Sequence, residues 1–274
     1  MKIGILHPGE MGISVCRAVH ASGHEVLWCS EARSRATLER ASSVDAMAIG
    51  SLEKFCRKAD GIISVCPPHA AQALAKAVAS TGYEGIYLDA NAVSPATAES
   101  ISEIIGPNYV DGGIIGPPAN DPGSTRMYVS GNLSDEVVEW LSEGNLEVID
   151  IGKGKVRAST LKMAYAAYTK GSSALILAVN ALAEAGGVRD ELVREWSISQ
   201  PGLDKRSDAA AKGSSRKAWR FVGEMAEIAV TFEKLGLPGG FHQSAGEIYR
   251  RMADLKDLPA SELDAVLTEI LDKS

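Results

Sequence analysis

The chain has 274 residues, of which 45% are hydrophobic and 23% are charged. This composition is typical of globular proteins, and the length allows two domains that each bury a core, so a mainly disordered chain is excluded. The formal net charge of −7 lacks the basic excess of nucleic-acid-binding and anionic-membrane-binding proteins. No apolar run is long enough to span a bilayer, and the four cysteines form no CxxC pair. We therefore expect a cytoplasmic protein without disulfides, membrane contact or a nucleic-acid partner.

The first half of the chain alternates β-rich runs with helical stretches. Strands are expected over residues 2–6, 25–29, 46–49, 61–65, 85–89, 109–115, 126–130 and 146–150. Helical patterns fill most gaps, for example over 70–80 and after Ser94-Pro95, a pair typical of an N-cap followed by a first-turn proline. This alternation predicts an α/β Rossmann domain, with a doubly wound, mostly parallel sheet covered by helices on both faces.

The strand pattern stops after the turn Gly152-Lys153-Gly154. One long apolar helix is expected over 158–185, and shorter helices over 190–197, 215–235, 243–253 and 261–271. The chain is thus predicted to divide into a Rossmann domain over 1–154 and an all-helical substrate and dimerisation domain over 155–274. Because the long helix is apolar around most of its circumference, we expect a second copy to cover it in a homodimer.

The most informative local motif is the glycine turn between the first strand and the first helix, Ile3-Gly4-Ile5-Leu6-His7-Pro8-Gly9-Glu10-Met11-Gly12. Gly9 lets the backbone approach a pyrophosphate, and Gly12 lets the helix pack closely on the strand. Free N–H groups at the helix start bind the phosphates. His7 replaces the first glycine of the fingerprint, so a turn that serves backbone geometry alone is the alternative. The position after the first strand favours cofactor binding by Gly9, Glu10, Met11 and Gly12.

The residues after the second strand bear on the choice between NAD and NADP. Glu31 lies about twenty residues after the glycine turn, where an acid binds a free ribose 2′-hydroxyl and selects NAD. Arg33, with Ser30 and Ser34, would instead bind a 2′-phosphate. We expect NADP as the cofactor, with NAD as the alternative. The plainer interpretation of Arg33 is a solvated arginine without a ligand.

Further motifs fall in a fixed order along the chain. They are Gly9-Glu10-Met11-Gly12, Cys66-Pro67-Pro68, the segments 89–95 and 111–116, and Lys162 early in the long helix. On these residues the chain resembles the β-hydroxyacid dehydrogenase and 6-phosphogluconate dehydrogenase superfamily over nearly its whole length. It resembles most a branch with a distinctive C-terminal domain and unassigned substrates, through Gly116-Pro117-Pro118 and the segments 161–171 and 217–221. The resemblance implies Lys162 as the catalytic acid/base and further cofactor contacts at Cys66, Pro67, Pro68 and Asn91.

The chain departs from that family at three places. Ile115 replaces a serine that holds the substrate carboxylate, and Ala166 replaces an asparagine that orients the substrate. Gly223-Glu224 stands where the family has a Lys-Asp pair. The resemblance therefore supports the fold, the cofactor and Lys162, and it leaves the usual small hydroxy acid substrate open.

Oxidising an alcohol requires a base for the hydroxyl proton, and a lysine serves when its pKa falls from the ordinary value of about 10.4. Lys162, Tyr165, Ala166, Thr169 and Lys170 share one helix face. This face predicts an active-site wall in which Tyr165 donates a proton or anchors the substrate, the alternative being lysines that extend into solvent. Asn91, at the carboxyl edge of the sheet, would orient substrate or nicotinamide. Substrate contacts are expected at Gly116, Pro117, Lys170 and Arg220.

The expected function is an NAD(P)-dependent dehydrogenase or reductase for a hydroxy acid or related carbonyl compound. Two alternatives stay open: an imine reductase on the same fold, and a non-catalytic cofactor-binding redox sensor. His7, His69 and His242 are isolated along the chain and lack metal-ligand spacing, so no metal site is expected.

Overall fold

The computed structural model describes residues 1–31 and 33–272. The chain divides into two compact units, Met1–Lys162 and Met163–Ser274. Helix α7 (Arg157–Ala185) begins in the first unit and continues in the second. The division lies beyond the expected boundary at 154 because the first turns of α7 pack on the sheet of the first unit.

The first unit is built on one eight-stranded sheet with the order β3-β2-β1-β4-β5-β6-β7-β8. Neighbouring strands are parallel except β6 and β7, which are antiparallel. The order of the first six strands is that of a Rossmann fold, which confirms the expected fold class. The strands are β1 (Lys2–Ile5), β2 (Glu25–Cys29), β3 (Ala46–Ile49), β4 (Gly61–Ser64), β5 (Ile86–Asp89), β6 (Tyr109–Ile115), β7 (Thr125–Ser130) and β8 (Leu146–Asp150).

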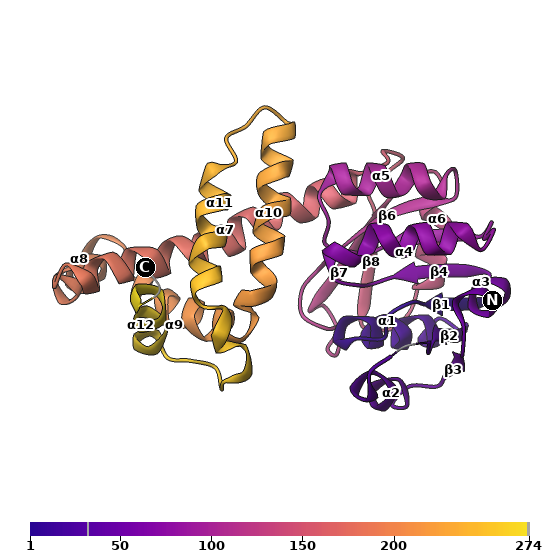
Figure 1. Ribbon diagram of the computed structural model, residues 1–274, viewed down its shortest axis with the longest axis horizontal. Coiled ribbons are helices and arrows are strands. Elements are labelled where there is room, and N and C mark those ends of the chain that lie inside the picture. The colour runs from indigo at the N-terminus through magenta and orange to yellow at the C-terminus, as the bar shows by residue number, and fades with distance from the viewer. Residues whose placement is uncertain (32, 273–274) are drawn as a thin grey trace. The chain divides into compact units, whose positions relative to one another are not determined.

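Helices cover both faces of this sheet (Figure 1). On one face, Val15 of α1 (Glu10–Ala21) and Trp140 of α6 (Ser134–Trp140) join the core. On the other, Phe55 and Ile101 belong to a second core beneath α3 (Leu52–Lys58), α4 (Pro68–Ser80) and α5 (Pro95–Ile105). Helix α2 (Arg35–Ala41) follows β2. Because the central strands are buried on both faces, their sequences are nearly continuous apolar runs, and the strand pattern located them to within a residue.

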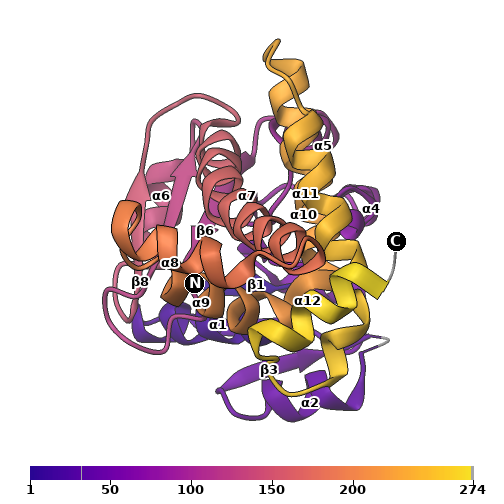
Figure 2. The same cartoon turned by 90° about the vertical axis from the view of Figure 1, so that its left-hand side faces the viewer.

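The second unit is all-helical, as expected. Besides α7 it contains α8 (Arg189–Ser199), α9 (Leu203–Ser214), α10 (Ala218–Lys234), α11 (Gly240–Arg251) and α12 (Leu263–Asp272), with short 3-10 turns at Ser215–Lys217 and Ala253–Asp257. Helices α10 and α11 run side by side (Figures 1 and 2). Helix α9 was missing from the expected helices because it buries serines and alanines, which leave no stripe of large apolar residues. Within the described ranges, no helix has the length and apolar character needed to cross a bilayer.

Candidate functional site

The glycine turn joins β1 to α1 at the carboxyl end of β1. Gly9 is the N-cap residue of α1, and its N–H donates to the carbonyl oxygen of His7 at 2.8 Å. A Cβ atom built on Gly12 would lie 2.1 Å from the same carbonyl oxygen, so no side chain fits there. Glu10 is exposed at the helix start, and Met11 packs against the core. The turn therefore has the close strand–helix packing of the dinucleotide fingerprint and presents the first N–H groups of α1 to a phosphate.

The segment after β2 brings Arg33 back over the end of its strand. The Nε atom of Arg33 donates to the carbonyl oxygen of Cys29 at 3.2 Å, and no described residue bonds its terminal nitrogens. Glu31 is engaged elsewhere, because its Oε2 accepts the N–H of Leu52 at 2.9 Å at the start of α3. The Ser30 hydroxyl donates to a neighbouring carbonyl oxygen, and Ser34 caps α2. Of the two charged groups expected to choose the cofactor, the arginine is the one left without a polar partner at its end.

A rung of four polar residues crosses the sheet at the carboxyl ends of β4 and β5. Register pairs link Ser64 to Asp89, Asp89 to Asp111, and Asp111 to Ser130, on β4, β5, β6 and β7 in turn. All four residues are at most 1% exposed. Burial raises the pKa of Asp89 to about 7, with a further contribution from the charge of Asp111, and burial raises the pKa of Asp111 to about 6. Sequence reasoning missed this rung because the strand pattern does not give the register.

Asp89 fixes the orientation of Asn91. Its Oδ1 atom accepts both the backbone N–H and the side-chain amide of Asn91, and that amide also donates to Ser64 Oγ at 3.1 Å. The Oδ1 atom of Asn91 accepts the N–H of Cys66. Asn91 is 2% exposed and thus braces the turn at Cys66, Pro67 and Pro68, from which α4 begins. Burial raises the pKa of the Cys66 thiol to about 12, so this thiol is not a ready nucleophile.

Asp111 anchors the first turn of α7. Its Oδ2 atom accepts the N–H of Ser159 at 2.8 Å, and its Oδ1 atom accepts the Ser159 hydroxyl. A carboxylate at a helix N-terminus satisfies free N–H groups and interacts favourably with the helix dipole. A Cβ atom on Gly113 would lie 2.8 Å from the carbonyl oxygen of Ala158 and 3.1 Å from the Cβ of Lys162, so this glycine lets α7 lie directly on β6. Together they place the half-buried Lys162 beside β6.

The other expected substrate residues lie at the surface. Gly116, with a φ of +128°, turns the chain after β6, and the carbonyl oxygen of Pro117 accepts the Thr125 hydroxyl at 2.5 Å. Gly116 and Pro117 are exposed. Tyr165 is 48% exposed on α7, and Arg220 is exposed near the start of α10. Neither of these two side chains bonds another described residue, so both are accessible to a ligand.

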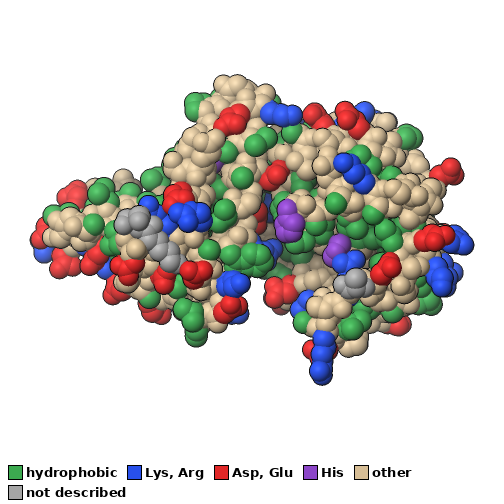
Figure 3. All heavy atoms as spheres, in the orientation of Figure 1, with side chains coloured by type: hydrophobic (Ala, Val, Ile, Leu, Met, Phe, Trp, Pro, Cys, Tyr) green, Lys and Arg blue, Asp and Glu red, His purple; other side chains and the backbone are tan. Residues whose placement is uncertain are grey.

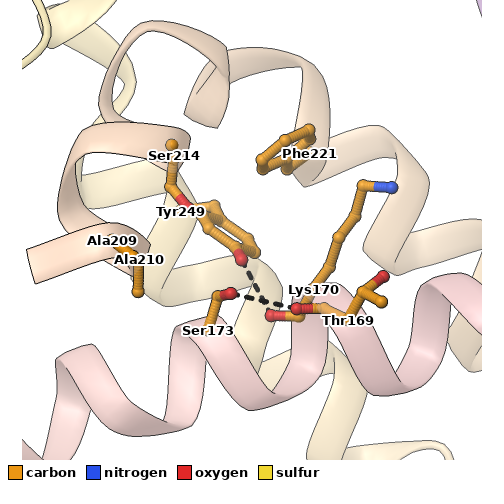
Figure 4. Close-up of a pocket in the computed structure, with 9 residues that line it drawn as sticks. Thr169, Lys170, Ser173, Ala209, Ala210, Ser214, Phe221 and Tyr249 are labelled. Atoms are coloured by element: carbon orange, nitrogen blue, oxygen red, sulfur yellow. Dashed lines mark hydrogen bonds between the residues drawn. The ribbon is translucent and has the colours of Figure 1, made fainter. Parts of the chain in front are cut away.

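The helical unit has a cavity of about 250 Å³. At its edge, Nζ of Lys170 lies 2.7 Å from Oε2 of Glu224 and 5.1 Å from the ring centre of Phe221. Figure 4 shows the Tyr249 hydroxyl directed at α7, where it donates to the carbonyl oxygen of Lys170 at 2.8 Å. The Lys170–Glu224 pair is largely desolvated. The cavity is lined by Thr169, Lys170, Ser173, Ala209, Ala210, Gly213, Ser214, Phe221 and Tyr249.

Two family models match separate parts of the chain. A model described as NADP oxidoreductase, coenzyme F420-dependent, matches residues 2–92, which contain the glycine turn, Arg33 and Asn91. A model described as a domain of unknown function, DUF1932, matches residues 183–252 in the helical unit. An uncharacterised 28.5 kDa protein of Methanothermus fervidus is 30% identical over 194 residues, which are 70% of this chain and 75% of that protein.

Solved structures resemble the chain over nearly its full length. A conserved protein of unknown function, described as structurally similar to 3-hydroxyacid dehydrogenases, is 25% identical with a TM-score of 0.70, covering 93% of this chain and 98% of its own. The Mycobacterium tuberculosis 3-hydroxyisobutyrate dehydrogenase is 15% identical with a TM-score of 0.69, covering 97% of each chain. A reductive aminase from Aspergillus terreus in complex with NADPH4, cyclohexanone and allyl amine is 15% identical with a TM-score of 0.56, covering 97% of this chain and 98% of its own. The last two show a common fold.

Proposed function

The chain belongs to the family of the uncharacterised Methanothermus fervidus protein, within the β-hydroxyacid dehydrogenase and 6-phosphogluconate dehydrogenase superfamily, and we propose its function on this premise. The proposed reaction is a hydride transfer between NADP(H) and a hydroxy acid or related carbonyl compound. The fold and the family matches support an NAD(P)-dependent oxidoreductase of the hydroxyacid dehydrogenase or imine reductase type. One observation carries the finer proposal: Asp111 and Gly113 fix the first turns of α7, and with them Lys162, on β6.

The residues present fit a dinucleotide. Gly12 lies so close to the turn that any side chain would clash, and α1 opens on the N–H groups that bind phosphate. The NADP preference rests on the two charged residues after β2. No described residue bonds the terminal nitrogens of Arg33, so they can bind a phosphate. The Glu31 carboxylate instead accepts a backbone N–H at the start of α3, so it does not bind a ribose hydroxyl in this conformation.

A bound nicotinamide supplies the hydride donor or acceptor for the reaction. In oxidation, the Lys162 amine takes the hydroxyl proton of the substrate as the hydride leaves the carbon. In reduction, the Lys162 ammonium returns a proton to the carbonyl oxygen. Asn91 acts by holding the Cys66 turn at the carboxyl edge of the sheet, where nucleotides bind in doubly wound folds. Tyr165, exposed three residues after Lys162, is the candidate for anchoring or protonating the substrate.

The spacing on α7 limits what Lys170 can do for a small substrate. Eight residues of helix separate Lys162 from Lys170, which corresponds to about 12 Å along the axis. A compact hydroxy acid is shorter than that, so a substrate that contacts both lysines must be elongated. Within the helical unit, the proposed substrate contacts are Lys170, which pairs with Glu224, and the exposed Arg220.

Imine reduction is the second candidate function, and it is supported by the likeness of the fold to that of a reductive aminase. The same lysine would then protonate an imine nitrogen in place of a carbonyl oxygen. A redox sensor without turnover is the third alternative. A screen that follows reduced-nicotinamide absorbance over hydroxy acids, keto acids, and keto acids with amines separates the three. We expect turnover with a hydroxy or keto acid. Turnover only with amines present would establish the imine reductase, and NADPH binding without turnover on the whole panel would favour the sensor.

A further inference from the structure

His7 occupies the place of the first fingerprint glycine, in the turn between β1 and Gly9. Its Nδ1 atom is buried and has no hydrogen-bond partner among the described residues. An imidazole nitrogen buried without a partner costs free energy in the unliganded protein. The burial of this nitrogen therefore requires an explanation, and backbone geometry does not give one, because glycine serves the turn equally well.

Arg33 is the charged neighbour of this imidazole. Burial lowers the pKa of His7 to about 4, and the charge of Arg33 contributes to the same shift. The hydrogen bond from Arg33 Nε to Cys29 keeps the guanidinium at the end of β2. The charge of Arg33 also lowers the pKa of the Cys66 thiol, whereas the charge of Asp89 on β5 raises it. Glu10 is exposed at the start of α1, and Glu31 caps α3.

His7 and Arg33, at the ends of β1 and β2, thus lie near enough for the charge of Arg33 to act on the imidazole, and no acidic side chain among the described residues pairs with either of them. In doubly wound folds the end of β2 receives the ribose 2′ position, while the pyrophosphate lies at the start of α1. Resting on the NADP(H) dependence proposed above, we propose that His7 and Arg33 together bind the 2′-phosphate of NADP(H), and that His7 takes up a proton when this phosphate binds.

The physical reason is a reversal of the local charge balance. Without ligand, a proton on His7 would be partly desolvated beside a guanidinium, so the neutral imidazole is favoured. A dianionic phosphate pairs with Arg33 and attracts a second positive charge, which raises the pKa of His7 toward or above its ordinary value of about 6.5. A rise from about 4 to about 6.5 tightens phosphate binding roughly fourfold at pH 6 and has little effect at pH 8.

The proposal is tested by NMR titration of the histidine ring signals in the full chain, alone, with NADPH and with NADH. The signal of His7 is assigned as the one missing from His7→Gly, which restores the fingerprint glycine and is expected to fold. We expect NADPH to raise the pKa of His7 by about two units, and NADH, which lacks the 2′-phosphate, to raise it much less. Arg33→Ala should raise the pKa of unliganded His7, since it removes a neighbouring positive charge.

Affinity measurements give an independent readout. His7→Gly should lose about fourfold of the NADPH-over-NADH preference at pH 6 and almost none at pH 8, relative to the unmutated protein. Titration of the phosphate itself is common to both proteins and cancels in this comparison. An equal rise in the pKa of His7 with NADH would assign the residue to the pyrophosphate and overturn the proposal. If NADPH binds and the pKa of His7 does not change, this inference alone is overturned. If NADPH does not bind, the proposed cofactor is overturned as well.

Discussion

Asp89 is a carboxylate that is 1% exposed and whose Oδ2 atom has no hydrogen-bond partner in the described part of the chain. Its other oxygen holds Asn91, and Asn91 holds the turn at Cys66. The register pairing with Asp111 places a second buried carboxylate on the neighbouring strand. The orientation of the Cys66 turn, which is predicted to contact the cofactor, is thus set by an acid whose ionisation the fold disfavours.

This arrangement gives a pH dependence of stability with a definite sign. The pKa of Asp89 is about 7 in the folded protein and near 3.9 when unfolded, so the folded state binds more protons between those values. The stabilisation from Asp89 is fully present below about pH 4 and is lost as the pH rises through 7. Asp89→Asn, which stays neutral, should gain free energy of unfolding relative to the unmutated protein between pH 5 and pH 8, by up to a few kcal/mol. Denaturant unfolding at the two pH values measures this, and a difference independent of pH would contradict it.

Cofactor choice is expected to depend on Arg33. A charge-assisted bond to phosphate is worth a few kcal/mol when partly shielded, so Arg33→Ala should weaken NADP(H) binding at least tenfold, and NAD(H) binding much less. Arg35→Ala is the matched control, because Arg35 is exposed and pairs with Glu39 one helical turn on. Isothermal titration with both cofactors provides the measurement. Equal affinity of the unmutated protein for NADP(H) and NAD(H) would refute the preference.

Single residues also show how far sequence can anticipate a site. Gly9 and Gly12 could be placed in the turn before α1 because their motif has fixed local spacing, whereas the role of Lys162 is a prediction from the family resemblance. The hydrogen bond that Glu31 accepts at the start of α3 could not be predicted, because its partner lies 21 residues away in sequence. Asn91 is similar: its position at the sheet edge was predictable, but its buried bonds to Asp89 and Cys66 follow from strand register.

At the scale of elements, the contact between β6 and α7 decides where the proposed acid/base lies. A Cβ atom on Gly113 would press on the backbone of α7 at Ala158. Gly113→Ala should therefore displace the helix, cost about 1–3 kcal/mol in stability, and lower turnover while cofactor affinity changes little. Gly50→Ala is the control, because an added Cβ there meets nothing within 4 Å. Equal losses in turnover and cofactor affinity would show general damage instead of a displaced Lys162.

The helices also mark the limit of pattern reading. Large apolar residues at helical spacing located α7, α10 and α12, whereas α9 buries Ser207, Ala210, Ala211 and Ser214. Small residues bury little area, so they give a weak periodic signal even where a helix packs closely.

At the scale of the whole molecule, we propose a homodimer. A stripe on α7 made of Leu161, Tyr165, Tyr168, Leu175 and Leu182 is 36% to 74% exposed. Its members follow one another at steps of four, three, seven and seven residues, which is compatible with the heptad spacing of a coiled-coil seam. Helix α8 buries none of its residues, and Figure 3 shows apolar side chains at the surface of the helical unit. Such a seam suits a second copy, because a two-fold axis places the same stripe on both sides of the contact.

Light scattering at micromolar concentration should give a dimer mass for the unmutated protein. Leu175→Glu combined with Leu182→Glu should give a monomer with unchanged helix content, because it places charges in the seam. Leu235→Glu, at an exposed leucine outside α7, should leave the dimer intact. A monomeric unmutated protein would refute the homodimer.

The central claim, that Lys162 exchanges the substrate proton, is tested most directly by comparing turnover and cofactor affinity in Lys162→Ala. We expect turnover to fall by about two to four powers of ten, the range for a positioned acid or base. NADPH affinity should stay nearly unchanged, because the glycine turn and Arg33 remain. Lys162→Arg should rescue little, since a guanidinium does not act as a base. Near-normal turnover in Lys162→Ala, with activity abolished instead by Tyr165→Phe or Lys170→Ala, would contradict the account.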